Sequence, residues 1–223
     1  MTSLVWFRKD LRINDNPALV KACESQTVKA VYIDAIEQHR EHNQAPIQRD
    51  FIEKNLQCLA KALAEKGIVL EIIETDYFSD IAEILVNYCK KHAIEQVFAN
   101  RESGVNEQRR DHSVEKAIAV PLTVFHSQCI IPEGHLNTGK GEMFKVFTPF
   151  SRAWLKQLQL TGYNLFPAPK AIRKPIKLSM ADAKKNLSLR PINSHASTQS
   201  SNYWDAGEVA AGKQLALFCQ KQS

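Results

Sequence analysis

The sequence predicts an α/β fold, a doubly wound, Rossmann-like parallel sheet of five strands followed by a connector and a C-terminal helix. Short apolar runs alternate with longer amphipathic runs, which is the pattern of successive βα units. Most of the short runs are apolar on both faces, as expected of strands covered by helices on both sides. A length of 223 residues is enough for one such core and a smaller appendage.

Five short runs have the composition of buried strands. Parallel strands need a crossover connection, usually a helix, so each strand is expected to be followed by one. The carboxyl ends of all five strands then lie at one edge of the sheet, where open α/β sheets bind their ligands. The five runs are residues 4–7, 30–33, 69–73, 96–99 and 122–125.

The helices between these strands are marked by capping residues and by apolar spacing. Asn16 and Pro17 predict the start of the first helix, because asparagine caps well and proline fits the first helical position. Apolar residues within 52–63 recur at intervals of 4, 3 and 4, and Gly67 follows them as a terminator. A similar apolar stripe over 81–88 predicts another helix against the sheet.

After the fifth strand the pattern changes. Thr148 as N-cap and Pro149 as first helical residue predict a helix there. Residues 161–203 hold four of the nine prolines and show no sustained hydrophobic period, which is typical of a connector. We therefore expect the core to be complete without residues beyond about 160. The predicted organisation is an α/β domain at 1–130, a crossing segment and helix at 131–160, a connector at 161–203 and a last helical segment at 204–223.

Composition excludes several classes of protein. The start shows no secretory signal, and no apolar run approaches the ~18 residues of a membrane span, so we expect a cytoplasmic protein without a membrane partner. Five scattered cysteines and seven histidines show no zinc-binding spacing, so we expect no metal site. Residues 151–223 carry 11 Lys and Arg against 3 Asp and Glu, which suits a solvated linker or, as the less favoured reading, nucleic-acid contact.

The loop after the first strand, residues 8–12, contains no glycine. Both the G-x-G-x-x-G dinucleotide loop and the G-x-x-x-x-G-K-[ST] phosphate loop need glycine for the close approach of backbone to phosphate. No nucleophile elbow or Ser/His/Asp series is present either, so no catalytic residue is expected. By its motifs this is a binding domain.

The loops after the first, second and fourth strands bring four candidate binding residues to one place: Arg8, His42, Asn106 and Glu107. A guanidinium, an imidazole, an amide and a carboxylate together suit a flat heterocycle. The Glu107 carboxylate is able to accept two parallel hydrogen bonds from an N–H beside an NH₂, the edge that pterins and guanines present.

Structural roles explain the same residues equally simply. Asn106 suits the N-cap of a helix, and Glu107 then lies favourably in its first turn. His42 suits an exposed loop position, and Arg8 suits a surface ion pair with Asp10. Position alone does not choose between these readings and a ligand site.

Three blocks of sequence resemble the photolyase/cryptochrome family in their order and spacing. They are V-W-F-R-K-D-L-R-I-N-D-N-P-A-L at 5–19, V-N-E-Q-R-R-D at 105–111 and M-F-K-V-F-T-P-F-S-R-A-W-L at 143–155. The resemblance covers residues 1 to about 220 and is greatest to bacterial class I cyclobutane pyrimidine dimer photolyases.

The resemblance implies a 5,10-methenyltetrahydrofolate antenna bound by His42, Asn106 and Glu107 and, with less support, Arg8. It implies that FAD binds in an all-helical C-terminal domain. The sequence ends near 218–219, before the family's first flavin contacts, so we expect this chain to lack that domain and to be inactive alone. The full-length protein is implied to be a monomeric deoxyribodipyrimidine photolyase, a carbon-carbon lyase that repairs dimers in UV-damaged DNA with light.

Two alternatives stay open. One is a cryptochrome-type photoreceptor, which shares the α/β domain and differs in the part that is absent. The other is a free-standing nucleotide-binding α/β protein, against which the glycine-free first loop argues.

Overall fold

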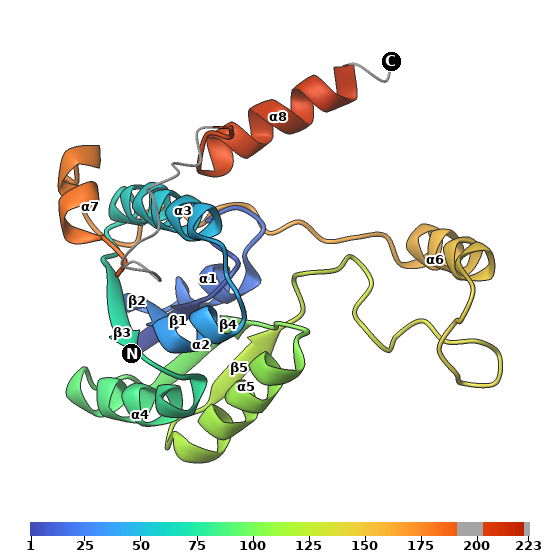
Figure 1. The fold of residues 1–223 in the computed structure, drawn as a ribbon, viewed down its shortest axis with the longest axis horizontal. Helices are drawn as coiled ribbons and strands as arrows, with labels where there is room; N and C mark the ends of the chain where they lie inside the picture. The colour runs from blue at the N-terminus through green and yellow to red at the C-terminus, as the bar shows by residue number, and fades with distance from the viewer. Residues whose placement is uncertain (191–202, 221–223) are drawn as a thin grey trace.

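The computed structural model describes residues 1–190 and 203–220, and a five-stranded parallel sheet forms its centre (Figure 1). The strand order is β3-β2-β1-β4-β5, so the predicted Rossmann-like sheet is confirmed. All four neighbouring pairs run parallel. The strands are β1 (Thr2–Phe7), β2 (Thr27–Ala35), β3 (Leu70–Thr75), β4 (Gln96–Asn100) and β5 (Leu122–Phe125).

Helices cover both faces of the sheet (Figure 1). Side chains of β1 alternate between the two layers, with Val5 and Phe7 packed toward α1 and α3 and Leu4 and Trp6 packed toward α4 and α5. All four are at most 1% exposed, which explains why the strands read as continuously apolar. The layer helices are α1 (Pro17–Ala22), α3 (Pro46–Ala64), the 3₁₀ turn η1 (Phe78–Asp80), α4 (Ile81–Lys91) and α5 (Val105–Ala117).

The predicted helix signals in the first 70 residues are confirmed. The Asn16 side chain accepts a hydrogen bond of 3.0 Å from the Leu19 N–H, and Pro17 is the first residue of α1. Gly67 follows α3 with φ of +77°, the left-handed conformation that favours glycine. A Cβ at Gly67 would lie 2.7 Å from the Cβ of Arg173, so the connector approaches the backbone there closely.

The connector contributes to the core, contrary to the expectation that nothing beyond about residue 160 is needed. The Ile172 N–H donates to the Lys66 carbonyl (3.1 Å), which ties this extended segment to the end of α3. Ala183, Leu187 and Leu189 are then buried in the same apolar cluster as α3. Three apolar residues without a long helical repeat gave no periodic signal in the sequence.

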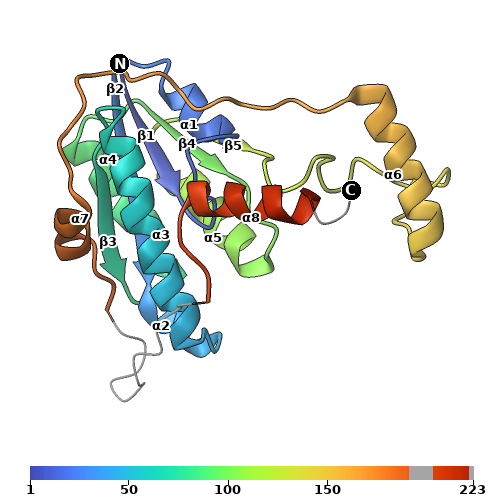
Figure 2. The same cartoon turned by 90° about the horizontal axis from the view of Figure 1, so that it is seen from above.

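Two short helices were not predicted from the sequence: α2 (Ile36–Glu41) after β2 and α7 (Met180–Asn186) in the connector. Figure 2 shows α7 beside α3 and the connector running along that layer. Helices of six and seven residues contain too few turns for a clear apolar period. Residues 191–202 of the predicted connector lie outside the described part of the chain.

The helix after the fifth strand begins two residues earlier than expected. α6 (Phe147–Thr161) has Val146 at its N-cap and no side-chain cap, so the assignment of Thr148 as N-cap was wrong and Pro149 is the third helical residue. Proline lacks an N–H and is tolerated throughout the first turn, so its position alone did not fix the start. α6 has no buried residue and projects from the sheet (Figure 1).

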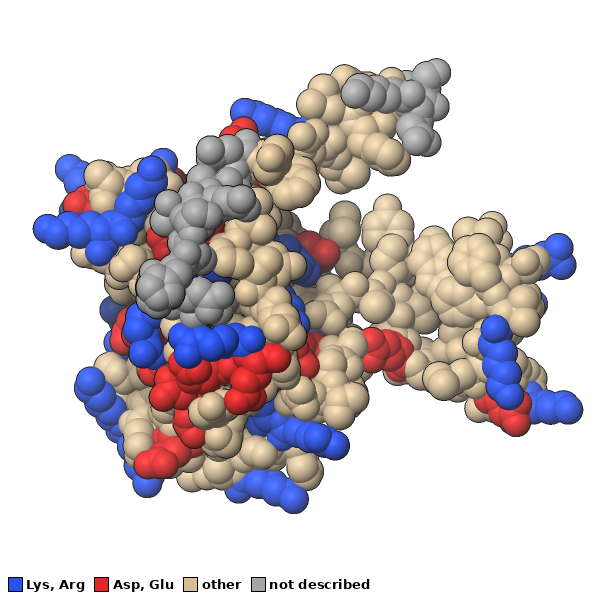
Figure 3. Space-filling view, viewed as in Figure 1, with Lys and Arg blue, Asp and Glu red and all other residues tan. Residues whose placement is uncertain are grey.

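The last helix, α8 (Glu208–Gln220), forms where the apolar residues of 209–219 predicted it. The Glu208 carboxylate accepts hydrogen bonds from the N–H groups of Ile13 (2.8 Å) and Asn14 (3.1 Å), which attach α8 to the loop after β1. Leu217 and Phe218 are exposed. The surfaces of α6 and α8 are largely uncharged in Figure 3.

Candidate functional site

The strand order reverses between β1 and β4, and the side chains of interest lie at the carboxyl edge next to this point. The chain leaves β1 toward α1 on one face and leaves β4 toward α5 on the other face. Such a reversal is where doubly wound sheets bind ligands. We call Lys9, His42, Asn106 and Glu107 at this edge the switch-point site.

Glu107 lies in the first turn of α5, where the helix dipole favours a carboxylate. Its side chain is 15% exposed, and its Oε1 accepts a hydrogen bond of 3.0 Å from Lys9 Nζ. Burial tends to raise the pKa of Glu107, but the hydrogen bond from Lys9 and the charge of Arg110 outweigh it and lower the pKa overall. Glu107 is therefore an ionised acceptor at neutral pH.

The carboxylate of Glu107 folds back over Gly104, the N-cap of α5. A Cβ at Gly104 would lie 2.0 Å from Glu107 Oε2, so this position of the carboxylate requires the absence of a side chain there. Asn106 is the second helical residue, so the alternative that it caps the helix is wrong. The α5 N-cap uses no side chain, which leaves the Asn106 amide free for other contacts.

His42 ends α2 and reaches across to α5. Its Nε2 lies 3.3 Å from Asn106 Nδ2 and 3.2 Å from Gln38 Nε2. Both His42 and Asn106 are exposed, so their polar atoms face solvent beside Glu107. The structure thus brings together three of the four predicted site residues.

The fourth, Arg8, lies beneath the site rather than in it. Its side chain is 4% exposed, and its Nη1 donates to both carboxylate oxygens of Asp111 at 2.8 and 2.7 Å. The guanidinium lies 4.7 Å from the centre of the Trp6 ring. Burial lowers the pKa of Arg8, and the charge of Asp111 offsets part of that effect. Arg8 therefore supports the loop after β1, and the alternative of a surface ion pair with Asp10 is wrong.

Two further charged residues, Arg110 and Glu102, complete the layer beneath the site. Arg110 Nη2 donates to Glu102 Oε2 at 2.8 Å, and its guanidinium lies 4.8 Å from the centre of the Trp6 ring. Sequence analysis did not identify Asp111 or Glu102 as partners of Arg8. Asp111 lies one helical turn after Glu107 on the same side of α5, and that spacing is the signal that points to it.

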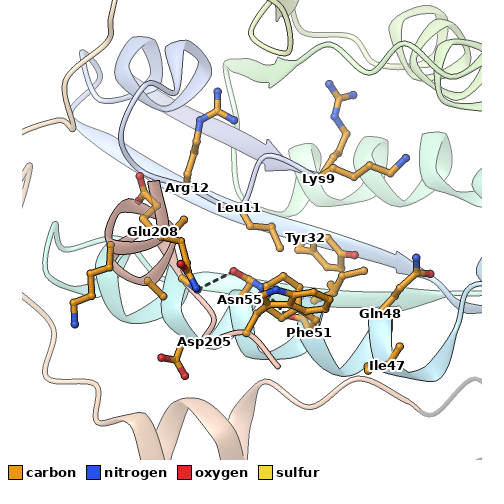
Figure 4. A pocket seen from close by; sticks show the side chains of 18 of the residues that line it. Lys9, Leu11, Arg12, Tyr32, Ile47, Gln48, Phe51, Asn55, Asp205 and Glu208 are labelled. Carbon is orange, nitrogen blue, oxygen red and sulfur yellow. Dashed lines mark hydrogen bonds between the residues drawn. The ribbon is translucent and has the colours of Figure 1, made fainter. Parts of the chain in front are cut away.

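A larger cavity of about 1070 Å³ lies on the other side of the loop after β1, between α3 and α8 (Figure 4). Aromatic side chains Tyr32, Phe51 and Trp204 form part of its wall. The Gly207 N–H donates to Asn55 Oδ1 (2.9 Å), the bond drawn in Figure 4. This cavity has the size and apolar wall of a small-molecule site, and Glu107, Asn106 and His42 do not line it.

Other site types find no support in the described ranges, 1–190 and 203–220. They contain no group of three or more His, Cys, Asp or Glu side chains arranged to hold a metal ion. Within the same ranges, no helix combines the length and apolar character that crossing a membrane requires.

Comparison with known proteins places the chain in a family. The DNA photolyase family model matches residues 3–171. Over 172 residues the chain is 44% identical to a deoxyribodipyrimidine photo-lyase of Salmonella typhimurium, covering 76% of the chain and 36% of the relative. Over 222 residues it is 38% identical to the Escherichia coli deoxyribodipyrimidine photo-lyase, covering 98% and 46%. The chain therefore spans less than half the length of these curated relatives.

Solved structures agree on the fold. A class III photolyase from Agrobacterium tumefaciens superposes with a TM-score of 0.68 at 24% identity, covering 96% of this chain and 44% of that one. A photolyase from Sulfolobus tokodaii gives a TM-score of 0.64 at 16% identity, covering 85% and 42%. Together with the family model, which matches most of the chain, these findings decide against a free-standing nucleotide-binding protein of another family. The chain belongs to the DNA photolyase family.

Proposed function

We propose that the switch-point site binds an antenna pigment of the pterin type, 5,10-methenyltetrahydrofolate, through Glu107, Asn106 and His42. The observation that carries the proposal is the position of Glu107, an ionised and mostly buried carboxylate beside two exposed polar side chains at the strand-order reversal. This pigment, when bound, supplies absorption of near-ultraviolet light.

The chemistry of the three side chains fits such a ligand. A carboxylate with two oxygens accepts the paired N–H and NH₂ of a pterin edge, and charge-assisted bonds of this kind are the stronger ones. Asn106 offers both a donor and an acceptor, and His42 offers a ring that stacks or hydrogen-bonds. Asn106 and Glu107 belong to α5 and His42 follows α2, so the site is built from two separate elements.

We propose that the full-length protein is a deoxyribodipyrimidine photolyase that repairs cyclobutane pyrimidine dimers in UV-damaged DNA, with FAD bound in a helical domain beyond residue 203. The support is the 38 to 44% identity to proteins of that name. This chain covers only 36% and 46% of the length of those two relatives. The domain boundaries at 1–130, 131–160, 161–203 and 204–223 belong to the same proposal. The exposed apolar side chains of α8 suit the beginning of such a domain.

We also propose a cytoplasmic monomer. The cysteines of the described residues are all unpaired thiols, as is usual in a reducing compartment. The edge strands β3 and β5 are only six and four residues long, which limits pairing between copies. Size-exclusion chromatography with light scattering tests the second half of this proposal, and a dimer would contradict it.

The first experiment is a titration of the purified chain with 5,10-methenyltetrahydrofolate, followed by near-ultraviolet absorbance. Glu107→Gln removes the charge and keeps the size of the side chain. It should weaken binding by about ten- to a hundredfold, which is the contribution of one hydrogen bond to a charged group. Glu115→Gln is the matched control, because it removes an exposed carboxylate from the same helix. Equal binding by the wild type and Glu107→Gln would contradict the proposal.

A third variant separates the switch-point site from the cavity between α3 and α8. Phe51→Ala removes part of the aromatic wall of that cavity, which Glu107, Asn106 and His42 do not line. We expect it to bind folate like the wild type. Loss of binding in Phe51→Ala with normal binding in Glu107→Gln would move the pigment to the cavity.

The cryptochrome alternative is tested separately, with a protein that includes the helical domain. Arabidopsis thaliana cryptochrome-1 is also a relative, 25% identical over 183 residues, so resemblance alone does not distinguish repair from signalling. We expect near-ultraviolet light to restore dimer-containing DNA in the presence of the full-length protein. Flavin loading without any repair would favour the signalling role.

A further inference from the structure

Lys9 lies between two carboxylates at the switch-point site. Its Nζ is 3.0 Å from Glu107 Oε1 and 3.6 Å from Glu102 Oε1. The side chain is 70% exposed, and Lys9 also lines the cavity between α3 and α8 (Figure 4). A lysine stem of four methylene groups allows the ammonium to shift between two acceptors this close.

The two carboxylates differ in how well they are satisfied. Glu102 is 5% exposed, and its Oε2 accepts the hydrogen bond from Arg110. Its Oε1 is buried and has no hydrogen-bond partner among the described residues, since the Lys9 contact is too long for one. A buried carboxylate oxygen without a donor is costly, so the resting arrangement leaves one favourable position for the ammonium unused.

Glu107, by contrast, has the Lys9 ammonium on the oxygen that a ligand would need. The hydrogen bond at 3.0 Å covers Oε1, while Oε2 lies over Gly104. A pterin edge that donates two parallel hydrogen bonds needs both oxygens. The Lys9 ammonium and a pterin edge therefore compete for Oε1 of Glu107.

We propose that Lys9 is a displaceable counter-ion that sets the affinity of the switch-point site: it pairs with Glu107 in the empty site and moves to Glu102 Oε1 when a donor edge binds Glu107. This inference rests on the proposed function of Glu107. Lys9 acts through Glu107 and is a positioning residue. The move replaces the interaction lost at Glu107 with one at Glu102, so the Lys9 ammonium keeps a carboxylate partner when the ligand is bound.

The test is the same folate titration with Lys9→Met, which keeps the length of the side chain and removes the ammonium. Because the ligand no longer displaces a cation, binding should be about three- to tenfold tighter than in the wild type, as for a partly exposed ion pair. Lys21→Met is the control, since it removes an exposed ion pair with Glu24 from α1. Unchanged or weaker binding in Lys9→Met would overturn the inference.

The outcome separates the inference from the proposed function. If Glu107→Gln weakens binding and Lys9→Met does not tighten it, only the role of Lys9 is wrong. If Glu107→Gln binds normally, the assignment of the acceptor is wrong and the role of Lys9 falls with it. A thermal melt of each variant confirms that it is folded.

A second readout follows the ammonium itself. Burial tends to lower the pKa of Lys9, but its hydrogen bond to Glu107 and the nearby charge of Glu102 outweigh this and raise the pKa overall. In protein labelled with ¹³C at lysine Cε, an exchange to Glu102 keeps that pKa raised when folate is bound. A fall to the ordinary lysine value would show release to solvent and contradict the exchange.

Discussion

At the scale of single residues, the unusual feature is a pair of arginines stacked on one tryptophan. Arg8 and Arg110 lie 4.7 and 4.8 Å from the centre of the Trp6 ring, and both are almost fully buried. The two guanidinium charges repel, since the charge of Arg110 lowers the pKa of Arg8, so the arrangement depends on the carboxylates of Asp111 and Glu102. This layer holds the loop that carries Lys9 and the helix that carries Glu107.

We predict that Asp111→Asn destabilises the protein by about 3 to 5 kcal/mol, because it leaves a buried guanidinium without its main partner. Glu115→Gln, which removes an exposed carboxylate from the same helix, should cost less than about 1 kcal/mol. Urea unfolding followed by circular dichroism measures both. A cost for Asp111→Asn no greater than that of the control would show that the stacked pair needs no buried counter-ion.

The structure brings together three of the four candidate residues, as sequence analysis expected, and buries the fourth, Arg8, against Asp111. Asn106 and Glu107 follow a predicted strand, and their meeting with His42 follows from topology alone. The burial of Arg8 was not predictable, because it depends on Asp111 lying opposite after folding. A charged residue in a loop is expected to be exposed to solvent unless a buried partner of opposite charge is known.

At the scale of elements, the connector is part of the α/β core. Leu187 is 6% exposed and packs in the cluster that includes α3. Nearby, Arg190 Nε lies 2.8 Å from Glu74 Oε2, so the connector is also attached to the end of β3. The connector therefore covers α3 instead of merely linking two domains.

We predict that Leu187→Ala costs about 2 to 5 kcal/mol, the usual range for removing a buried leucine side chain. Leu165→Ala, in the exposed part of the same connector, should change the free energy of unfolding by no more than about 0.5 kcal/mol. Chemical denaturation of the two variants and the wild type makes the comparison. Equal stability of all three would restore the view that the core ends before residue 160.

Elements with strong local signals were predictable, and elements without them were not. The first helix was visible because Asn16 and Pro17 combine a side-chain cap with a fixed backbone angle. α2 and α7 form because flanking segments pack them in place, as Ala183 shows by its burial against the core. Tertiary contacts of this kind leave no period in the sequence.

At the scale of the whole molecule, the order of buried and amphipathic runs was sufficient for the sheet. Five strands linked by helices admit few topologies, and the strand order places the site at the reversal between β1 and β4. The positions of α6 and α8 did not follow from the sequence. Their apolar side chains are exposed, so no internal packing dictates where they lie.

The most direct test of the central claim is a crystal structure of the chain with bound 5,10-methenyltetrahydrofolate. We predict that the N–H and NH₂ edge of the pterin lies on the two oxygens of Glu107, with His42 and Asn106 at its sides and the Lys9 ammonium on Glu102. A pigment located in the cavity beside Phe51, with Glu107 still paired to Lys9, would contradict the account.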